Sequence, residues 1–423
     1  MVERREVVSV REAVEKVMRE VKGVELEKVP IEWSDGRFLG VDLIAEQPIP
    51  SFDRSGFDGY AVRAADLQEA SMEQPVDLEV LEEVGAGAVP SVTVGESQAV
   101  RIMTGAQMPH GADAVIMLEL TEDVLCDGKK RVRIKRPVRS GDNVIFTGQD
   151  AKAGTVLVSK GTVINPGVKA LLATLGHREV TVAKKPVIGL FVTGNELLDI
   201  DEPLVPGKIR NSNSYMIAAQ ITRSGGEPKY MGKLPDHLDT CYEQIHNALE
   251  EVDILITTGG VSVGDYDYMP AIYEKLTAQV LFNKIAMRPG SVTTVASWKG
   301  KLLFGLSGNP SACYVGFELL VRPVVRSLLC TPNPHLKKIQ AMLDTDFLKA
   351  NPFTRFVRSK IAYREGRVVV SPSGLDKSNV VTSLAQSDSL MILPGGTRGY
   401  EKGRDVDVLL LEDQEGSEWP WEE

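Results

Sequence analysis

The start of the chain combines a polar capping signal with an apolar stripe at helical spacing. Ser9 and Glu12 form a capping-box pattern, in which a hydroxyl residue stands three positions before an acid. The stripe consists of Val10, Ala13, Val14, Val17 and Val21. Because positions three and four apart share one face of an α-helix, the pattern predicts that the chain opens with an amphipathic helix.

Between residues 48 and 137 the pattern changes to short apolar runs interrupted by glycine and proline. The runs cover residues 76–84, 99–103, 114–120 and 131–134. Branched apolar residues favour strands, and glycine and proline mark the turns between strands. This segment is therefore expected to be a β-dominated insertion.

From residue 186 to residue 329, strand-like and helix-like runs alternate, which is typical of a doubly wound α/β domain. The runs cover residues 187–192, 214–223, 229–231, 238–252, 253–257 and 269–276. In the run 238–252, Cys241, Ile245 and Leu249 recur at helical spacing. One face of this helix should therefore pack on the sheet.

The remaining pattern predicts one more helix and a β domain. Asn309 and Pro310 favour a helix start, with Asn309 as the N-cap, and Pro323 is expected to kink or end the helix. Alternating runs after Lys338 predict a small closed β domain. These runs cover residues 354–362, 367–371, 390–393 and 406–411.

A glycine-rich loop at residues 257–268 follows the apolar run 254–256 and precedes a helix-like stretch. A strand, a glycine turn and a helix N-terminus together point backbone N–H groups at an anion, and Asp265 and Asp267 could hold a hard cation. Phosphate with magnesium is the simplest ligand. The alternative is that the glycines only close a tight turn. The spacing fits neither a dinucleotide fingerprint nor a P-loop.

Size and charge narrow the classes of function. A chain of 423 residues is expected to form two to four domains. A net charge of −10 argues against a protein that coats nucleic acid. An anionic substrate would need local cations to reverse the sign of the field, and Lys284, Arg288 and Arg210 are the candidates.

Four cysteines lie far apart, without a CxxC pair: Cys126, Cys241, Cys313 and Cys330. They are expected to be buried thiols in a reducing cytoplasm. The charged N-terminus has no apolar segment after it, and no run of eighteen apolar residues exists. The protein is therefore expected to be cytoplasmic, without a membrane or a nucleic acid as partner.

Several acids lie in a loop or at the end of a strand-like run. Asp58 lies in the loop 51–63, Glu196 follows Thr193 and Gly194, and Asp236 follows Leu234 and Pro235. Such acids are candidates for magnesium coordination or for polar substrate contacts. Each also has a purely structural interpretation, as a turn residue or an acid at a helix start.

Five sequence motifs, taken in their order along the chain, resemble those of the MoeA family of molybdenum cofactor biosynthesis proteins. The motifs are SFDRSGFDGYAVR at residues 51–63, MTGAQMPHGADAVIM at 103–117, VTGNEL at 192–197, TTGGVSVGDYDY at 257–268 and LSGNPSACYVGFELLVRP at 306–323. The match extends over nearly the whole chain, and five long loops in a fixed order make it specific.

The resemblance implies an activity and an architecture. The activity is a magnesium-dependent transfer: molybdate is inserted into adenylylated molybdopterin and AMP is released. The architecture is an elongated homodimer with four domains in each subunit. They are a linking domain at residues 1–50 and 140–180, a β-rich lobe at 51–139, a MogA-like, molybdopterin-binding α/β domain at 181–330 and a small β-barrel at 331–423.

The resemblance also assigns residues. Asp58 and Thr104 would reach the α/β domain from the lobe of the partner subunit, and the other catalytic positions are Asp150, Glu196, Asp236 and Asp267. Glu196, Asp236 and Asp267 would hold Mg2+. The substrate-binding positions are Gly259, Gly260, Ser262, Gly264, Lys284, Arg288, Ser291 and Asn309.

The chain departs from the family pattern at two basic positions. Ile145, Phe146 and Thr147 stand where many members carry an arginine-rich stretch before the acid, here Asp150, and Ser291 stands where many carry a second lysine. Both changes remove cations that would hold an oxyanion.

Two other functions fit the same residues. One is the adenylylation of molybdopterin, because the family's partner enzyme shares the α/β domain, although it lacks the lobe and the barrel. The other is a non-catalytic dimeric scaffold that binds a peptide. That adenylyltransferase and other proteins of the pathway are candidate partners. Tungstate could replace molybdate, since the two oxyanions have the same charge and nearly the same size.

Overall fold

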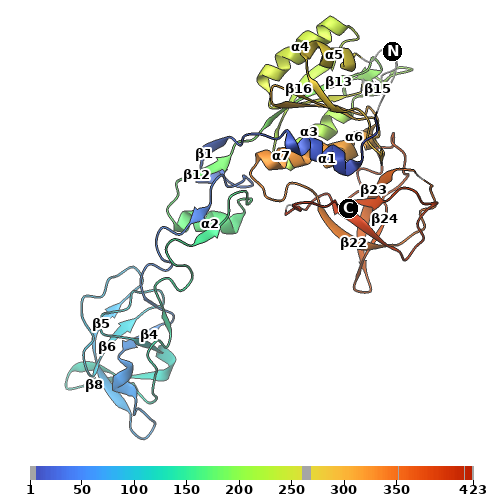
Figure 1. Ribbon diagram of the computed structural model, residues 1–423. Coiled ribbons are helices and arrows are strands. Elements are labelled where there is room, and N and C mark those ends of the chain that lie inside the picture. The colour runs from blue at the N-terminus through green and yellow to red at the C-terminus, as the bar shows by residue number, and fades with distance from the viewer. Residues whose placement is uncertain (1–5, 260–267, 351, 414, 422–423) are drawn as a thin grey trace. The chain divides into compact units, whose positions relative to one another are not determined.

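The computed structural model describes residues 6–259, 268–350, 352–413 and 415–421 (Figure 1). Its contacts divide the chain into two compact units. The α/β unit comprises Met1–Val41, Lys160–Ala170 and His177–Glu423. The lobe unit comprises Asp42–Ser159 and Leu171–Gly176. Helix α2 (Pro166–Thr174) spans a boundary between the two.

The predicted opening helix is confirmed as α1 (Val10–Arg19). The Ser9 side chain accepts a hydrogen bond from the Glu12 amide at 3.1 Å, which satisfies one of the free N–H groups at the helix start. Ala13, Val14 and Val17 are buried in the main core of the α/β unit. The apolar stripe predicted from the sequence is therefore the face that packs.

A six-stranded sheet forms the centre of the α/β unit, in the order β16-β13-β17-β21-β20-β18. The first four strands are parallel to one another. β20 runs antiparallel to its neighbours β21 and β18 on either side. The strands are β16 (Glu227–Leu234), β13 (Val187–Thr193), β17 (Ile254–Thr258), β21 (Lys301–Leu306), β20 (Thr294–Trp298) and β18 (Gln279–Phe282).

Helices cover both faces of this sheet. In Figure 1, α4 (Leu238–Glu251) and α5 (Met269–Leu276) lie on one face, and α3 (Asn213–Ser224) lies on the other. Successive residues of β17 alternate between the two cores, because side chains along a strand point to opposite faces. The prediction of a doubly wound α/β domain is confirmed.

The last helical region is interrupted by a π-helical turn. It comprises α6 (Pro310–Gly316), the π segment η4 (Phe317–Val321) and α7 (Arg322–Leu328). Asn309 occupies the N-cap position as predicted, but its side chain makes no capping hydrogen bond, which corrects the expected role of that side chain. Pro323 is the second residue of α7, in the first turn, where its missing N–H costs no helical hydrogen bond. The expected interruption at this proline is therefore confirmed as the break between η4 and α7.

The C-terminal part of the α/β unit is a closed barrel, as predicted. Its strands follow the order β23-β24-β22-β26-β25, and β25 pairs again with β23. They are β22 (Lys337–Leu343), β23 (Thr354–Arg364), β24 (Arg367–Pro372), β25 (Ser389–Leu393) and β26 (Asp405–Leu410). The short β19 (Met287–Arg288) pairs with β23, and the ribbon of β1 (Leu26–Pro30) and β12 (Glu179–Ala183) lies outside the barrel.

The lobe unit is built on a second six-stranded sheet, in the order β7-β4-β6-β5-β9-β8. This confirms a β-dominated insertion. The strands are β4 (Gly59–Val62), β5 (Val76–Val84), β6 (Gln98–Ile102), β7 (Ala114–Met117), β8 (Thr121–Cys126) and β9 (Lys129–Ile134). Two short pairs complete the unit: β3 (Arg54–Ser55) with β10 (Val144–Ile145), and β2 (Leu43–Ile44) with β11 (Val156–Val158).

The cysteines correct one expectation. Cys241 and Cys313 are buried, but Cys330 is only half-buried and Cys126, at the end of the edge strand β8, is exposed. Cys126 is the last residue of β8, at the turn that leads into β9. Among the described helices, none has both the length and the apolar character that crossing a bilayer requires.

Candidate functional site

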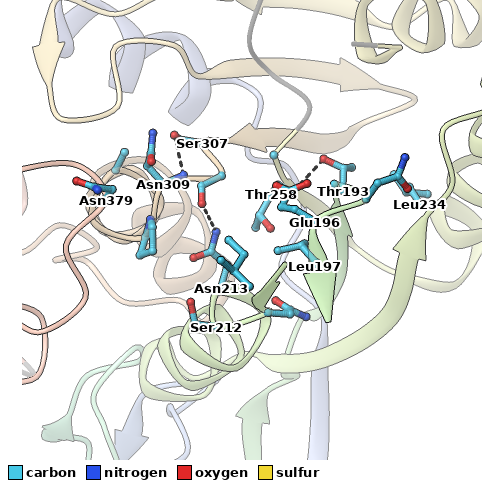
Figure 2. Close-up of a pocket in the computed structure, with 18 of the residues that line it drawn as sticks. Thr193, Glu196, Leu197, Ser212, Asn213, Leu234, Thr258, Ser307, Asn309 and Asn379 are labelled. Atoms are coloured by element: carbon cyan, nitrogen blue, oxygen red, sulfur yellow. Dashed lines mark hydrogen bonds between the residues drawn. The ribbon is translucent and has the colours of Figure 1, made fainter. Parts of the chain in front are cut away.

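A cavity of about 1320 Å³ lies at the carboxyl ends of the parallel strands (Figure 2). The last residues of β13, β16 and β17 line it: Thr193, Leu234 and Thr258. Ser307, directly after β21, lines it as well. The carboxyl edge of a parallel sheet is where ligands of doubly wound domains bind. The topology therefore places a large cavity where the glycine loop begins.

Two of the predicted acids line this cavity. Glu196 follows β13, and its carbonyl accepts a hydrogen bond from the Ile209 amide at 2.9 Å. That bond belongs to the parallel pairing of β14 (Leu197–Leu198) with β15 (Ile209–Arg210), which fixes the backbone beside the acid. Asp236 follows β16, and its carboxylate accepts a hydrogen bond from the Asn195 side chain.

Within the described residues, no lysine or arginine forms an ion pair with Glu196 or Asp236. Nearby lysines bond to backbone carbonyls instead: Lys208 Nζ donates to Asn195 O at 2.6 Å, and Lys233 Nζ donates to Leu197 O at 3.3 Å. The two acids thus bring negative charge to the cavity, and neither has an ion-pair partner among the described residues. Carboxylate oxygens of this kind are ligands for a hard cation.

The third predicted metal ligand, Asp267, lies outside the described residues, as do Gly260, Ser262, Gly264 and Asp265. In the part of the chain that the structure describes, no group of three or more acids, histidines or cysteines is close enough together to hold a metal ion. The structure therefore brings Glu196 and Asp236 to one cavity and leaves the full predicted set of three untested.

Gly259, the first described glycine of the loop, lines the cavity with a φ of +86°. Its amide donates to Leu306 O at 3.0 Å. A Cβ atom here would lie 2.6 Å from Thr193 Oγ1 and 2.8 Å from Thr193 O. Both the left-handed backbone and the close approach of β13 require glycine at this position.

The predicted substrate-binding residues after the glycine loop divide into two groups. Ser291 and Asn309 line the cavity. Lys284 and Arg288 are not among the lining residues: Lys284 O accepts a hydrogen bond from the Val8 amide at 3.1 Å, and Arg288 is exposed on β19. Arg210, the third candidate cation, does line the cavity.

Sequence reasoning missed a group of amide and hydroxyl side chains on the cavity wall. Asn211, Ser212 and Asn213 come from the start of α3, and Asn213 Nδ2 donates to Gly308 O at 2.9 Å. Ser378 and Asn379 come from the C-terminal barrel. The run of short polar residues before α3 was the available signal, because such residues gather at helix starts and turns.

The lobe unit brings a second set of predicted residues together. Thr104 donates two hydrogen bonds to Asp58 Oδ1, from its amide and from Oγ1, each at 2.6 Å. These bonds stabilise the ionised carboxylate and hold the pKa of Asp58 below its usual value. The fully buried Ser55 joins the two loops, since its backbone exchanges hydrogen bonds with Gly105 and Ala106.

Asp150 lies at the end of a third loop of the lobe unit. This loop follows β10, the partner strand of β3, and is tied to Asp53 by two hydrogen bonds of 2.7 Å from Thr147. Asp150 itself is exposed, and its amide donates to Ile49 O at 3.0 Å. Four large apolar side chains are also exposed on these three loops: Phe52, Phe57, Met103 and Phe146.

Three family models match successive parts of the chain. Residues 8–176 match the MoeA N-terminal region (domain I and II), residues 189–327 a probable molybdopterin binding domain, and residues 340–411 the MoeA C-terminal region (domain IV). A Bacillus subtilis (strain 168) protein named molybdopterin molybdenumtransferase is 55% identical over 421 residues, which cover 100% of this chain and 98% of that relative. The chain belongs to the MoeA family.

Other members of the MoeA family support the same assignment. A molybdopterin molybdenumtransferase of Staphylococcus aureus (strain N315) is 45% identical over 99% of both chains. The crystal structure of a molybdopterin biosynthesis MoeA protein from Pyrococcus horikosii has a TM-score of 0.84 and 33% identity, and covers 96% of this chain and 100% of that one. The expectation of a transferase of molybdenum cofactor biosynthesis is confirmed at this level.

Proposed function

We propose that this MoeA-family protein inserts molybdate into adenylylated molybdopterin and releases AMP in a step that requires Mg2+. The observation that carries the proposal is the pair Glu196 and Asp236, which line one cavity at the carboxyl edge of the sheet and form no ion pair with a described lysine or arginine. Relatives named molybdopterin molybdenumtransferase support the choice of molybdopterin and molybdenum as reactants.

The donor set fits a magnesium ion. Mg2+ binds through one or two carboxylates together with substrate phosphates, and it prefers oxygen ligands. Glu196 and Asp236 supply such oxygens, and Asp267 is the third proposed ligand. When bound, the ion would supply positive charge to the phosphates as the anhydride bond to AMP breaks.

The protein's own residues would bind and orient the two anions. The left-handed turn at Gly259 and the loop that continues with Gly260, Ser262 and Gly264 would present amides to a phosphate. Ser291 and Asn309 line the cavity and can donate hydrogen bonds to an oxyanion.

Arg210 is the described cation on this cavity wall, and we assign to it part of the charge that the family's absent bases would supply. Lys284 and Arg288 stay in the proposal because of their place in the family motif. Molybdate and tungstate have the same charge and nearly the same size, so these donors would bind either oxyanion.

The proposed active unit is a cytoplasmic homodimer in which Asp58, Thr104 and Asp150 act on the cavity of the partner subunit. The acids and the exposed Phe52 and Phe57 lie on neighbouring loops of the lobe unit. Exposed apolar residues around fixed polar groups are typical of an interface. The adenylyltransferase that would make the substrate is a candidate transient partner.

The direct test is the release of AMP by purified protein from adenylylated molybdopterin, molybdate and Mg2+. Glu196→Gln and Asp236→Asn should each lower the rate by about 100-fold, because each removes a charge placed at the reacting phosphates. Glu243→Gln is the matched control, since Glu243 is an exposed acid on α4 away from the cavity lining. Unchanged rates in both cavity variants would contradict the site assignment.

The same assay separates the competing functions. Consumption of ATP with free molybdopterin would indicate the adenylylation step instead. Tight peptide binding without any AMP would indicate a scaffold.

A further inference from the structure

The C-terminal barrel contributes part of the cavity wall. Ser378, Asn379 and Val381 line the cavity, although every other lining residue comes from residues 193–312. Figure 2 shows Asn379 on the wall that also carries Asn309. These residues belong to the segment 375–381, which lies between β24 and β25 and has no regular secondary structure of its own. Its position therefore depends on contacts with other elements.

One set of contacts comes from the α/β domain. Ser311, in the first turn of α6, is fully buried. Its amide donates to Ser378 O at 3.0 Å, and its Oγ donates to Val380 O at 2.6 Å. Two carbonyls of the segment are thus fixed by a residue that stands two positions after Asn309 on the cavity wall.

A second set comes from the barrel. Arg358 on β23 is 2% exposed, and its Nη2 donates to Leu375 O at 3.4 Å and to Lys377 O at 3.2 Å. Its Nη1 donates to Asp376 Oδ1 at 3.1 Å. Arg355 Nη1 donates to the other oxygen of the same carboxylate at 2.6 Å. The Arg358 guanidinium therefore holds three consecutive residues of the segment, 375–377.

The placement of this arginine favours a positioning role over a purely stabilising one. Burying an ion pair costs desolvation, and apolar residues of similar volume often stabilise a core as well or better. The planar fork of arginine can fix several carbonyls at once, which an apolar residue cannot do. On the same strand, Arg364 pairs with Asp344 at 3.0 Å on the surface, away from the residues that line the cavity.

We propose that Arg358 and Ser311 are positioning residues that hold the segment 375–381 as a substrate-contacting wall of the cavity. The inference rests on the proposed function for the identity of the substrate. Wall contacts act on bound substrate and transition state alike, so their loss is expected to raise KM and to leave kcat nearly unchanged.

The kinetic test compares four variants in the AMP-release assay. Arg358→Met removes the anchor and should raise KM for adenylylated molybdopterin about tenfold, and Ser311→Ala should raise it about threefold. Arg358→Lys keeps the charge but loses the fork, so KM should fall between the values of wild type and Arg358→Met. The control Arg364→Met should leave KM and kcat unchanged.

A second measurement does not depend on turnover. A nitroxide label on Val381→Cys, in a Cys126→Ser, Cys330→Ser background, reports the motion of the segment by electron paramagnetic resonance. Arg358→Met and Ser311→Ala should each narrow the lines of the nitroxide spectrum, because the label moves faster on a segment that has lost an anchor. Arg364→Met should leave the line widths unchanged. If Arg358→Met fails to fold, Ser311→Ala decides the question.

Unchanged spectra in both anchor variants, or equal changes in the Arg364→Met control, would overturn the positioning role. If the wild-type protein releases no AMP, the proposed function is wrong. The spectra of the labelled protein still test the positioning role, because they do not depend on turnover.

Discussion

Two hydrogen bonds from one threonine lower the pKa of the acid that we propose to act from the lobe. Thr104 donates both its amide and its hydroxyl to Oδ1 of Asp58, and within the described residues no hydrogen bond is made to the other carboxylate oxygen. Because the hydrogen bonds favour the ionised form, the pKa of Asp58 lies below its usual value. The carboxylate therefore stays ionised to lower pH than an ordinary aspartate, without a described lysine or arginine in direct contact.

Thr104→Val should move the acid limb of the activity profile to higher pH. The variant loses the hydroxyl bond, so the pKa of Asp58 should rise toward its ordinary value and the acid should be protonated earlier as pH falls. The measurement is AMP release as a function of pH. Thr147→Val is the control, because Thr147 makes the same pair of bonds to Asp53. An unshifted acid limb would argue against a role for ionised Asp58.

His335 should make the α/β unit sensitive to acid. Burial and the nearby charge of Arg322 lower the pKa of His335 from 6.5 to about 4. Between pH 6.5 and about pH 4, this histidine is therefore protonated in the unfolded chain but not in the folded protein. The stability that the neutral ring contributes is complete above pH 6.5 and is lost as pH falls toward 4.

Urea denaturation at pH 7 and pH 4.5 can test this prediction. The wild-type protein should lose up to about 3 kcal/mol more than His335→Gln between the two pH values. His237→Gln, which changes an exposed ring, should behave as wild type. An identical pH dependence in wild type and His335→Gln would show that this histidine is not the cause.

At the scale of elements, the carboxyl ends of β13 and β17 approach each other so closely that only glycine fits. Gly259→Ala places a methyl group against Thr193 and also strains a left-handed backbone. We expect activity to fall about 100-fold, since a displacement on the order of 1 Å misaligns the bound groups. Folding stability should fall by about 1–2 kcal/mol.

Gly300→Ala separates these two effects. Gly300 has a φ of +82°, but no atom lies within 4 Å of the Cβ position. The substitution should therefore cost conformational strain while leaving AMP release intact. Equal losses of activity in Gly259→Ala and Gly300→Ala would show that strain, and not the approach to Thr193, is responsible.

Periodic elements could be predicted from the sequence because their signal is local. The stripe around Val14 gives α1, and the spacing of Cys241, Ile245 and Leu249 gives the buried face of α4. The acids Glu196 and Asp236 could be found because each directly follows a parallel strand. Strand ends of one parallel sheet meet at one edge, so local reasoning places these acids in the same cavity.

Features that depend on tertiary contacts could not be predicted in this way. Nothing near Asn379 in the sequence indicates that the barrel segment reaches the cavity, because Ser311 and Arg358 hold it there from distant parts of the chain. The charges of Lys284 and Arg288 make them candidates for anion binding, but neither lines the cavity. Charge alone does not determine where a side chain lies in the fold. Cys126 shows the same limit, since its exposure depends on what packs over the end of the β8–β9 hairpin and not on its own residue type.

At the scale of the whole molecule, the proposed site needs two subunits, and this can be tested by mixing inactive chains. Asp58→Ala and Glu196→Ala should each be inactive alone. If Asp58 acts on the partner's cavity, a mixed dimer keeps one intact site out of two. Co-expression with random pairing should then restore about a quarter of wild-type activity. No recovery in purified mixed dimers would indicate that both acids serve one subunit.

The central claim is that Glu196 and Asp236 bind a divalent cation in the cavity. Its most direct test is a titration with Mn2+, as a paramagnetic substitute for Mg2+, followed by electron paramagnetic resonance in the presence of AMP. We expect the wild type and Glu243→Gln to bind the ion, and Glu196→Gln combined with Asp236→Asn to weaken binding at least about tenfold. Equal affinity in all three proteins would contradict the claim.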